Sequence, residues 1–419
     1  MSSSLRSLAS RPARWLVPAG VDPAVVPLLA ARSLRAFADG FVAVLLPAYL
    51  LSLGLSTLQV GILSTATMLG SAFATLAVGA WGHRVAPARL LRGAGLLMAA
   101  TGAGFAGLSA FWPLLAVAFF GTLNPSSGDV SVFLPLEHSR LAGSAQGSAR
   151  TALFARYSVL GALCASLGAL AAAVPDILAR YTPVSHLAAL RAMFGLYALT
   201  GVIVWWLYYH GTPTGAADRP SAAVAAAPLG PSRRIVLRLA ALFCVDSFAG
   251  GLMVNALFSL WLLQRFGLSL AQAGAFFFCS GLLSATSQLA APLVAKRIGL
   301  LNTMVFTHIP ANLCLIAAAL VPNPQVAMAL LLARAALSQM DVPTRSAYVM
   351  AVVTPAERAA AASFTAVPRS LAAALSPTLA AAMLAAGWIA LPLVACGVLK
   401  TAYDVVLWRA CRHEVLDEH

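Results

Sequence analysis

Ionisable side chains stand inside several long apolar stretches of the sequence. A charge in a hydrocarbon environment is costly, so such residues face the interior of a helix bundle and mark pathways for ions or substrates. We therefore take each of them as a candidate for ion handling, substrate binding or gating. They are Asp39, Asp129, Arg156, Asp246, Arg334, Asp341, Arg345, Arg369, Lys400 and Asp404.

Two pairs of opposite charge are expected from the depths of these residues in their apolar segments. Asp129 and Asp341 lie at similar depths, and Arg156 and Arg369 lie at similar depths in the segments that follow. The spacing predicts Asp129 with Arg156 and Asp341 with Arg369, or the swapped set, because a buried pair avoids two isolated charges. Arg345, one turn after Asp341, could compete for the same carboxylate. Both a gate that separates during transport and a static contact remain open.

Asp39 and Asp246 have no obvious partner at equal depth. A carboxylate without a partner in apolar surroundings can take up and release a proton more readily than an exposed one. We hypothesise that one of the two carries a coupling proton, with Asp246 as the first choice. The alternative is a carboxylate that caps a broken helical turn or pairs with Arg334 or Arg345.

For several other charged or reactive residues, the sequence favours a structural role over a role in binding or transport. Lys400 and Asp404 are four residues apart and predict an ion pair within one helix. His308 is alone in its apolar segment, which favours a packed polar side chain. The six cysteines lie far apart without a CxxC spacing, so they predict neither a disulfide framework nor a metal site.

Polar residues near the middle of apolar segments are candidates for substrate contacts. Two of the segments carry prolines, at Asn124-Pro125 and at Val342-Pro343. Interruptions of this kind free backbone groups at mid-membrane depth and indicate a binding site, although simple proline kinks are an equal alternative. The candidates for the substrate cavity are Tyr49, Asn124, Asn255, Gln339 and Arg334.

The composition identifies the class of protein that must position these side chains. The chain has 419 residues, of which 60% are hydrophobic and 10% charged, and its mean hydropathy is +0.86. Soluble domains carry about 25% charged residues, so an ordinary soluble enzyme is excluded. The net charge of +14 is spread over short loops, as on the cytoplasmic face of a membrane protein, and does not indicate nucleic-acid binding.

Hydropathy predicts an all-α integral membrane protein with twelve transmembrane helices in two pseudo-symmetric halves, since about 20 apolar residues span a bilayer. We expect a cytoplasmic tail over 1–30, a six-helix half over 31–209, a linker over 210–234, a second half over 235–410 and a tail over 411–419. The helices are predicted at 31–52, 58–79, 90–108, 113–136, 149–174, 187–209, 235–263, 270–293, 300–321, 325–352, 358–386 and 388–410.

Basic residues predict the orientation. With the N-terminus inside, 19 Lys and Arg residues fall on or near the cytoplasmic side, Arg35 among them, and only Arg180, Arg191 and Arg265 fall outside. This bias places both termini in the cytoplasm. No cleavable signal peptide is apparent, and we expect a multi-pass monomer in the plasma (inner) membrane.

An internal repeat relates the two halves. Residues 54–61 and 267–274 share the pattern GLSxxQxG at an offset of 213, and the same offset carries Arg156 onto Arg369. An offset of 212 carries Asp129 onto Asp341. Because each half has an even number of helices, the repeats are parallel and related by an axis along the membrane normal.

Twelve helices in two halves with a long central linker resemble the major facilitator superfamily. Residues 79–84 retain part of its loop signature after helix two without the usual acidic residue, and residues 352–358 resemble its Pro-x-Glu-Arg loop. Residues 121–129 and 340–345 resemble a group of efflux permeases that includes arsenite exporters. The resemblance implies that helices 1, 4, 7 and 10 line a central cavity and that helices 2, 5, 8 and 11 join the halves.

These features predict a secondary transporter working by alternating access, with proton-coupled efflux of a drug, metabolite or metalloid such as arsenite. Uptake by a symporter or uniporter is the alternative, and a non-transporting receptor or scaffold is the alternative of another class. The phosphate-loop, HExxH and GxSxG patterns are absent. We therefore expect no enzyme activity and no cofactor; the expected partners are a small molecule, protons and the lipid bilayer.

Overall fold

The computed structural model describes residues 21, 25–126, 131–144, 147–211, 230, 232–354 and 357–412. These residues form helices and contain no strand. The helices are α3 (Val26–Ser52), α4 (Thr57–Trp81), α5 (Pro87–Gly107), α6 (Phe111–Phe120), α7 (Phe133–Gly143), α8 (Gly147–Ala171), α9 (Val174–Tyr181), α10 (His186–Gly211), α11 (Arg233–Gly251), α12 (Asn255–Phe266), α13 (Leu270–Ile298), α14 (Leu300–Leu320), α15 (Pro324–Ser338), α16 (Asp341–Ala351), α17 (Arg358–Ala385) and α18 (Leu391–Cys411).

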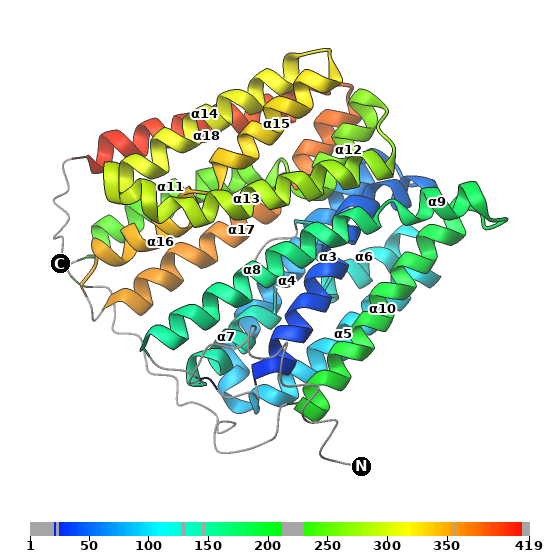
Figure 1. Cartoon of the computed structure of the whole chain (residues 1–419), viewed down its shortest axis with the longest axis horizontal. Helices are drawn as coiled ribbons and strands as arrows, with labels where there is room; N and C mark the ends of the chain where they lie inside the picture. Colours follow the sequence, from blue (N-terminus) through cyan, green and yellow to red (C-terminus); the bar gives the residue numbers. More distant parts are fainter. Residues whose placement is uncertain are drawn as a thin grey trace.

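The predicted all-α membrane fold is confirmed. In the described part of the chain, eleven helical segments are long and apolar enough to cross a membrane, and the short apolar α6 with α7 supplies the remaining span. Figure 1 shows two helix bundles side by side, one coloured blue to green and the other green to red. The first helix begins at Val26, five residues before the predicted start. Most of the predicted linker, residues 212–229 and 231, lies outside the described residues.

Three of the spans are broken near their middle. The fourth is interrupted between α6 and α7 and the tenth between α15 and α16, as the prolines predict. The seventh span was expected to be continuous, and this prediction is wrong, because α11 ends at Gly251 and α12 begins at Asn255. A Cβ at Gly251 would lie 2.1 Å from Ser376 Oγ of α17, so close helix contact requires glycine at this end of α11.

The repeated pattern GLSxxQxG has the same structural role in both halves. Gly54 and Gly267 adopt positive φ angles of 85° and 64°, which glycine tolerates at a helix end. Ser56 and Ser269 then form capping boxes with the glutamines three residues later, at the first turns of α4 and α13. The capping box supplies partners to helix N–H groups that would otherwise lack them. The sequence repeat therefore marks a helix start that both halves need.

The two halves meet through α4 with α17, α8 with α13 and α3 with α12. We call the end of the bundle that holds the α3–α4 and α12–α13 turns the distal end. Ser259 of α12 donates to the Val44 carbonyl of α3 at 2.9 Å, and Thr378 Oγ1 of α17 lies 2.8 Å from Thr65 Oγ1 of α4. Figure 1 shows α12 in the green-to-red bundle and α3 in the blue-to-green bundle, and these two helices are in contact. The distal ends of the halves are thus in contact in this structure.

The final glycine of each repeat permits this contact. A Cβ on Gly61 would lie 2.2 Å from the Ala381 Cβ of α17, and one on Gly274 would lie 2.4 Å from the Ala169 carbonyl oxygen of α8. Distances this short exclude any larger side chain unless the helices move apart. The pattern therefore encodes a helix start and a site of close approach between the halves.

The start of α11 is fastened to the loop between α16 and α17. The backbone N–H of Gly230 and the hydroxyl of Thr354, at 2.7 Å, donate to the carboxylate of Glu357. Hydrogen bonds from Ser232 and Thr354 and from the Gly230 backbone lower the pKa of Glu357 to about 2. This carboxylate therefore stays ionised, and keeps these contacts, until the pH falls well below neutrality.

Gly61→Ala and Gly274→Ala should each shift the protein toward a state with separated distal ends, because the added methyl group collides only when the halves are closed there. Distances between spin labels on the distal ends of α4 and α17 would measure the shift. Gly195→Ala on α10 is the matched control, since a Cβ there meets nothing within 4 Å. Unchanged distance distributions in both interface variants would contradict this role of the glycines.

Candidate functional site

Charged side chains in the described part of the chain gather into two buried clusters, one inside each half. The N-terminal cluster joins α3, α7, α8 and α10, and the C-terminal cluster joins α11, α14, α16 and α18. The ion pairs that form these clusters, and the exposed pair of His186 with Asp176, each connect residues of the same half. The clusters therefore bind helices together within each half.

Glu137 of α7 is the centre of the N-terminal cluster. Its carboxylate accepts hydrogen bonds from Arg35 of α3, from Tyr157 of α8 at 2.5 Å and from Tyr208 of α10 at 2.5 Å. Glu137 is 0% exposed and Arg35 is 2% exposed. One carboxylate thus accepts hydrogen bonds from three other helices and joins four helices in all.

This cluster is not among the contacts predicted from the sequence. Arg35 was counted among the cytoplasmic charges and Glu137 was placed beyond the end of the fourth helix. The structure instead buries Arg35, with its guanidinium 3.9 Å from the ring centroid of Phe133, because α3 begins earlier than predicted and α7 continues to Gly143. The aromatic residues Tyr157 and Tyr208 on the neighbouring spans were the available signal for a buried carboxylate.

Asp246 of α11 lies between two cations in the C-terminal cluster. Its Oδ1 is 2.5 Å from Lys400 Nζ of α18, and its Oδ2 is 3.1 Å from Arg345 Nη1 of α16. Arg345 also pairs with Asp341 within α16. Asp246 thus pairs with Arg345, as the alternative to the proton-carrier hypothesis predicts. The expectation that it has no partner at equal depth is wrong, because the chain brings α18 and α16 against α11. Two cations favour the ionised carboxylate, which does not suit a proton carrier.

Asp404 of α18 lies one turn beyond Lys400 and has neutral partners. Its Oδ1 is 3.0 Å from His308 Nδ1, and its Oδ2 accepts a hydrogen bond from the Asn312 amide at 3.1 Å, both from α14. The predicted ion pair between Lys400 and Asp404 is wrong, since Lys400 reaches Asp246 instead. His308 is packed as expected, but it takes part in this polar contact.

The two predicted symmetry-related pairs have different outcomes. Arg369 of α17 does not reach Asp341, because its Nε donates to Ser247 Oγ at 3.1 Å. Arg345 takes the Asp341 carboxylate, as the competing alternative predicts. Asp129 lies outside the described residues, so its pairing with Arg156 stays a prediction. Among the described atoms, Nη1 of Arg156 is buried without a hydrogen-bond partner.

Tyr49 and Asn124, two of the predicted substrate contacts, take part in structural hydrogen bonds. Tyr49 is 0% exposed and donates to the Phe105 carbonyl, so it belongs to the core of its half in this conformation. Asn124 accepts from Ser126 N at 3.1 Å within the break of the fourth span. Both residues thus shape the N-terminal half, and their contact with substrate stays a prediction.

The remaining candidates lie half-buried on the broken spans or on α3. Gln339 ends α15 and accepts from Gln288 at 3.3 Å; Asn255 begins α12. Arg334 is half-buried with its Nε unpaired, and Asp39 is half-buried four residues after Arg35. Their roles in substrate or proton binding stay predictions.

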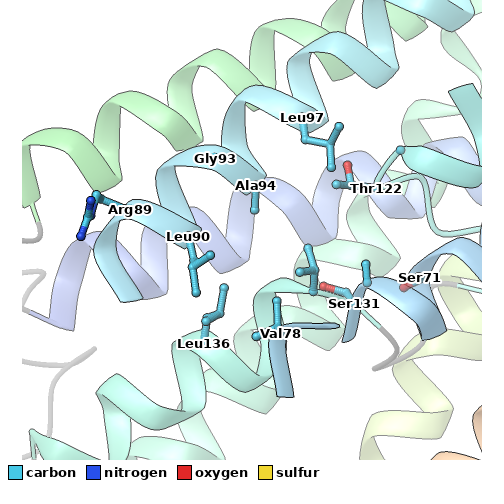
Figure 2. Close-up of a pocket in the computed structure, with 13 residues that line it drawn as sticks. Ser71, Val78, Arg89, Leu90, Gly93, Ala94, Leu97, Thr122, Ser131 and Leu136 are labelled. Atoms are coloured by element: carbon cyan, nitrogen blue, oxygen red, sulfur yellow. The ribbon is translucent and has the colours of Figure 1, made fainter. Parts of the chain in front are cut away.

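A cavity of about 240 Å³ opens beside the break of the fourth span. Its walls come mainly from α4, α5 and the break between α6 and α7 and are largely apolar, with Arg89 at one end and Ser71, Thr122 and Ser131 toward the other (Figure 2). None of the predicted substrate residues lines it. All the residues that line the cavity belong to the N-terminal half. The described residues contain no cluster of His, Cys, Asp and Glu suited to a metal ion.

The family model of the Major Facilitator Superfamily matches residues 28–339. An uncharacterized membrane protein of Saccharomyces cerevisiae is 24% identical over 364 residues, which cover 78% of this chain and 80% of the yeast protein. A bacterial homologue of the human lysosomal transporter Spinster, in an inward-facing and occupied conformation, has a TM-score of 0.71 at 16% identity and covers 93% of this chain and 96% of its own. A D-xylose–proton symporter has a TM-score of 0.72 at 15% identity, over 92% of this chain and 97% of its own.

Arg35→Met and Glu137→Gln should each lower the free energy of unfolding by about 3–5 kcal/mol, because each leaves a buried partner without its counter-charge. The double variant should cost less than the sum of the two. Thermal or denaturant unfolding in detergent measures this coupling. His186→Gln is the control: it removes one partner of the exposed pair with Asp176 and should cost less than about 1 kcal/mol. Simple additivity would contradict a direct pair.

Proposed function

The chain belongs to the major facilitator superfamily, and from this membership we propose that it is a secondary active transporter that moves a small molecule by alternating access. The observation that carries the proposal is the contact of the two halves through their distal ends. Hydroxyl contacts such as Thr65 with Thr378, and glycine contacts at Gly61 and Gly274, close this end. Such contacts involve no buried charge and can separate at modest cost.

We further propose that both termini are cytoplasmic, so that this structure is the inward-facing state. The excess of basic residues on the side of the termini supports this orientation. The Spinster homologue to which the fold is similar was solved in an inward-facing conformation. The distal contacts then form the outer gate in the plasma membrane.

Proton-coupled export is the mode of transport that we propose, with a drug, metabolite or metalloid as substrate. The resemblance of residues 121–129 and 340–345 to efflux permeases supports the direction. Proton-coupled uptake is the second candidate, and the similarity to a D-xylose–proton symporter favours it. A receptor or scaffold would differ from both because it would not need its distal gate to open.

Linking Thr65→Cys to Thr378→Cys by a disulfide should abolish flux, because the outer gate could no longer open. The two hydroxyl oxygens are 2.8 Å apart, and the native cysteines would be replaced by alanine. Flux in proteoliposomes would be followed with a panel of drugs, sugars, nucleosides and arsenite, before and after oxidation. Recovery on reduction and full activity of Thr65→Cys alone are the controls. Undiminished flux in the fully cross-linked protein would argue against alternating access.

Asp246→Asn should reduce every mode of transport, including substrate counterflow without a pH gradient. The substitution leaves Lys400 and Arg345 without a shared carboxylate, which is costly for buried charges. A proton carrier would behave differently, since its neutral variant keeps counterflow and loses only pH-driven flux. The two assays on the same proteoliposomes separate these roles. Retained counterflow with loss of pH-driven flux would restore Asp246 as the carrier.

A further inference from the structure

The His308–Asp404 pair differs from the other described acid clusters inside the bundle. Glu137, Asp246 and Asp341 each touch an arginine or lysine. Asp404 is 1% exposed, yet its two oxygens meet only an imidazole and a carboxamide. An ionised carboxylate without a permanent cation is costly at this depth, and a proton on the pair removes that cost.

The corresponding helix pair of the other half contains no such group. The repeat offset of 213 carries His308 onto Gly95 and Asn312 onto Ala99, both on α5. There the helices pack backbone against backbone: a Cβ on Gly95 would lie 2.9 Å from the backbone of Trp205, and one on Gly201 would lie 2.4 Å from Ala99 N. The polar contact between α5 and α10 lies elsewhere, where Arg92 donates to the carbonyls of Tyr208 and Tyr209 at 3.4 Å. A buried pair of a carboxylate and an imidazole at this position is therefore not a requirement of the fold.

Lys400 can connect this pair to the rest of the cluster. It stands four residues before Asp404 on α18, so both side chains lie on one face of the helix. Its ammonium now contacts Asp246, and its side chain passes Gly250 of α11, where an added Cβ would lie 3.7 Å from Nζ. The lysine thus has two carboxylates within reach of one flexible stem.

We propose that His308 and Asp404 form a proton-binding site and that Lys400 links its occupancy to Asp246 on α11. The inference rests on the proposed proton-coupled transport and names the site of the coupling proton. When the site is occupied, the Asp404 carboxyl group donates its proton to the hydrogen bond with His308 Nδ1, and Lys400 stays with Asp246. When the site empties, the proton on His308 Nε2 leaves to solution and the carboxyl proton passes to Nδ1, so that neutral His308 donates Nδ1–H to the Asp404 carboxylate, which then attracts Lys400.

The charges around the pair make this exchange reciprocal. Lys400 and Asp246 face His308 from α18 and α11, and Arg345 and Arg334 face it from α16 and α15. Helix α13 also packs against α14, and the basic residues of its last turn are Lys296 and Arg297. A cation that moves toward Asp404 favours loss of its proton, and a bound proton favours return of the cation to Asp246.

The release of Lys400 from Asp246 would affect the outer gate through the span formed by α11 and α12. The Asp246–Lys400 contact fixes α11 to α18. The same span continues as α12, whose Ser259 donates to the Val44 carbonyl and whose Ala256 N–H donates to the Pro125 carbonyl of the other half. A change at Asp246 therefore acts on the span that holds the distal ends together.

The test is ¹⁵N-histidine NMR of the full chain in lipid nanodiscs between about pH 5 and pH 9. His308→Gln identifies the His308 signals among the seven histidines. We expect Nδ1 of His308 to change between acceptor and donor over this range, and Asp404→Asn to abolish the change. The signals of His186, which pairs with Asp176 elsewhere, are the reference and should be the same in both proteins. A His308 tautomer that is constant at every pH would overturn the proposal.

A second measurement separates this site from the proposed function. Lys400→Met should preserve the change at His308 but remove the pH dependence of spin-label distances between the distal ends of α4 and α17, and Lys400→Arg should restore part of it. Persistence of that dependence in Lys400→Met would overturn the role of Lys400. A change at His308 without any pH-driven flux would support the site and refute proton-coupled transport. Flux without the change would refute the site alone.

Discussion

The requirement that a buried charge meet a counter-charge determines how each half of this protein is built. Water inside a protein bundle is scarce, and an isolated charge there costs several kcal/mol. Glu137 meets this requirement with an arginine and two tyrosines from three other helices. Asp246 meets it with one cation from α16 and one from α18. In both cases, satisfying a carboxylate fastens several helices into one body.

Contacts between the halves are of another kind. Among the described residues they are mostly hydroxyl, amide and backbone hydrogen bonds, such as Ser259 with Val44, and glycines that let helices approach. The one carboxylate among these hydrogen bonds, Asp176, is partly exposed and accepts from the Ala271 N–H at 3.3 Å. A neutral hydrogen bond contributes about 1 kcal/mol, whereas breaking a buried ion pair costs about 3–5 kcal/mol. The difference allows the interface to open while each half stays intact. Rigid halves with a weak interface are the mechanical condition for alternating access.

The sequence predicts the helices well because each span is apolar and the punctuation between spans is clear. It also predicts the repeated helix starts, since the capping serine, the glutamine and the close-contact glycine are all local in GLSxxQxG. Pairings between distant helices are not predictable from such local patterns. Arg35 and Glu137 are 102 residues apart, and Lys400 and Asp246 are 154 apart. Which of several charges at similar depth meet depends on helix rotation, and hydropathy does not encode rotation.

The two clusters use the same spans of each half with opposite signs. The N-terminal half places the cation on its first span and the carboxylate on its fourth, as Arg35 and Glu137. The C-terminal half reverses the signs, with Asp246 on its first span and Arg345 on its fourth. Moving one net charge across a membrane potential costs about 2.3 kcal/mol per 100 mV, so a half that moves must carry its charges as pairs. Each half thus carries a matched pair of opposite charges on its first and fourth spans, in opposite order.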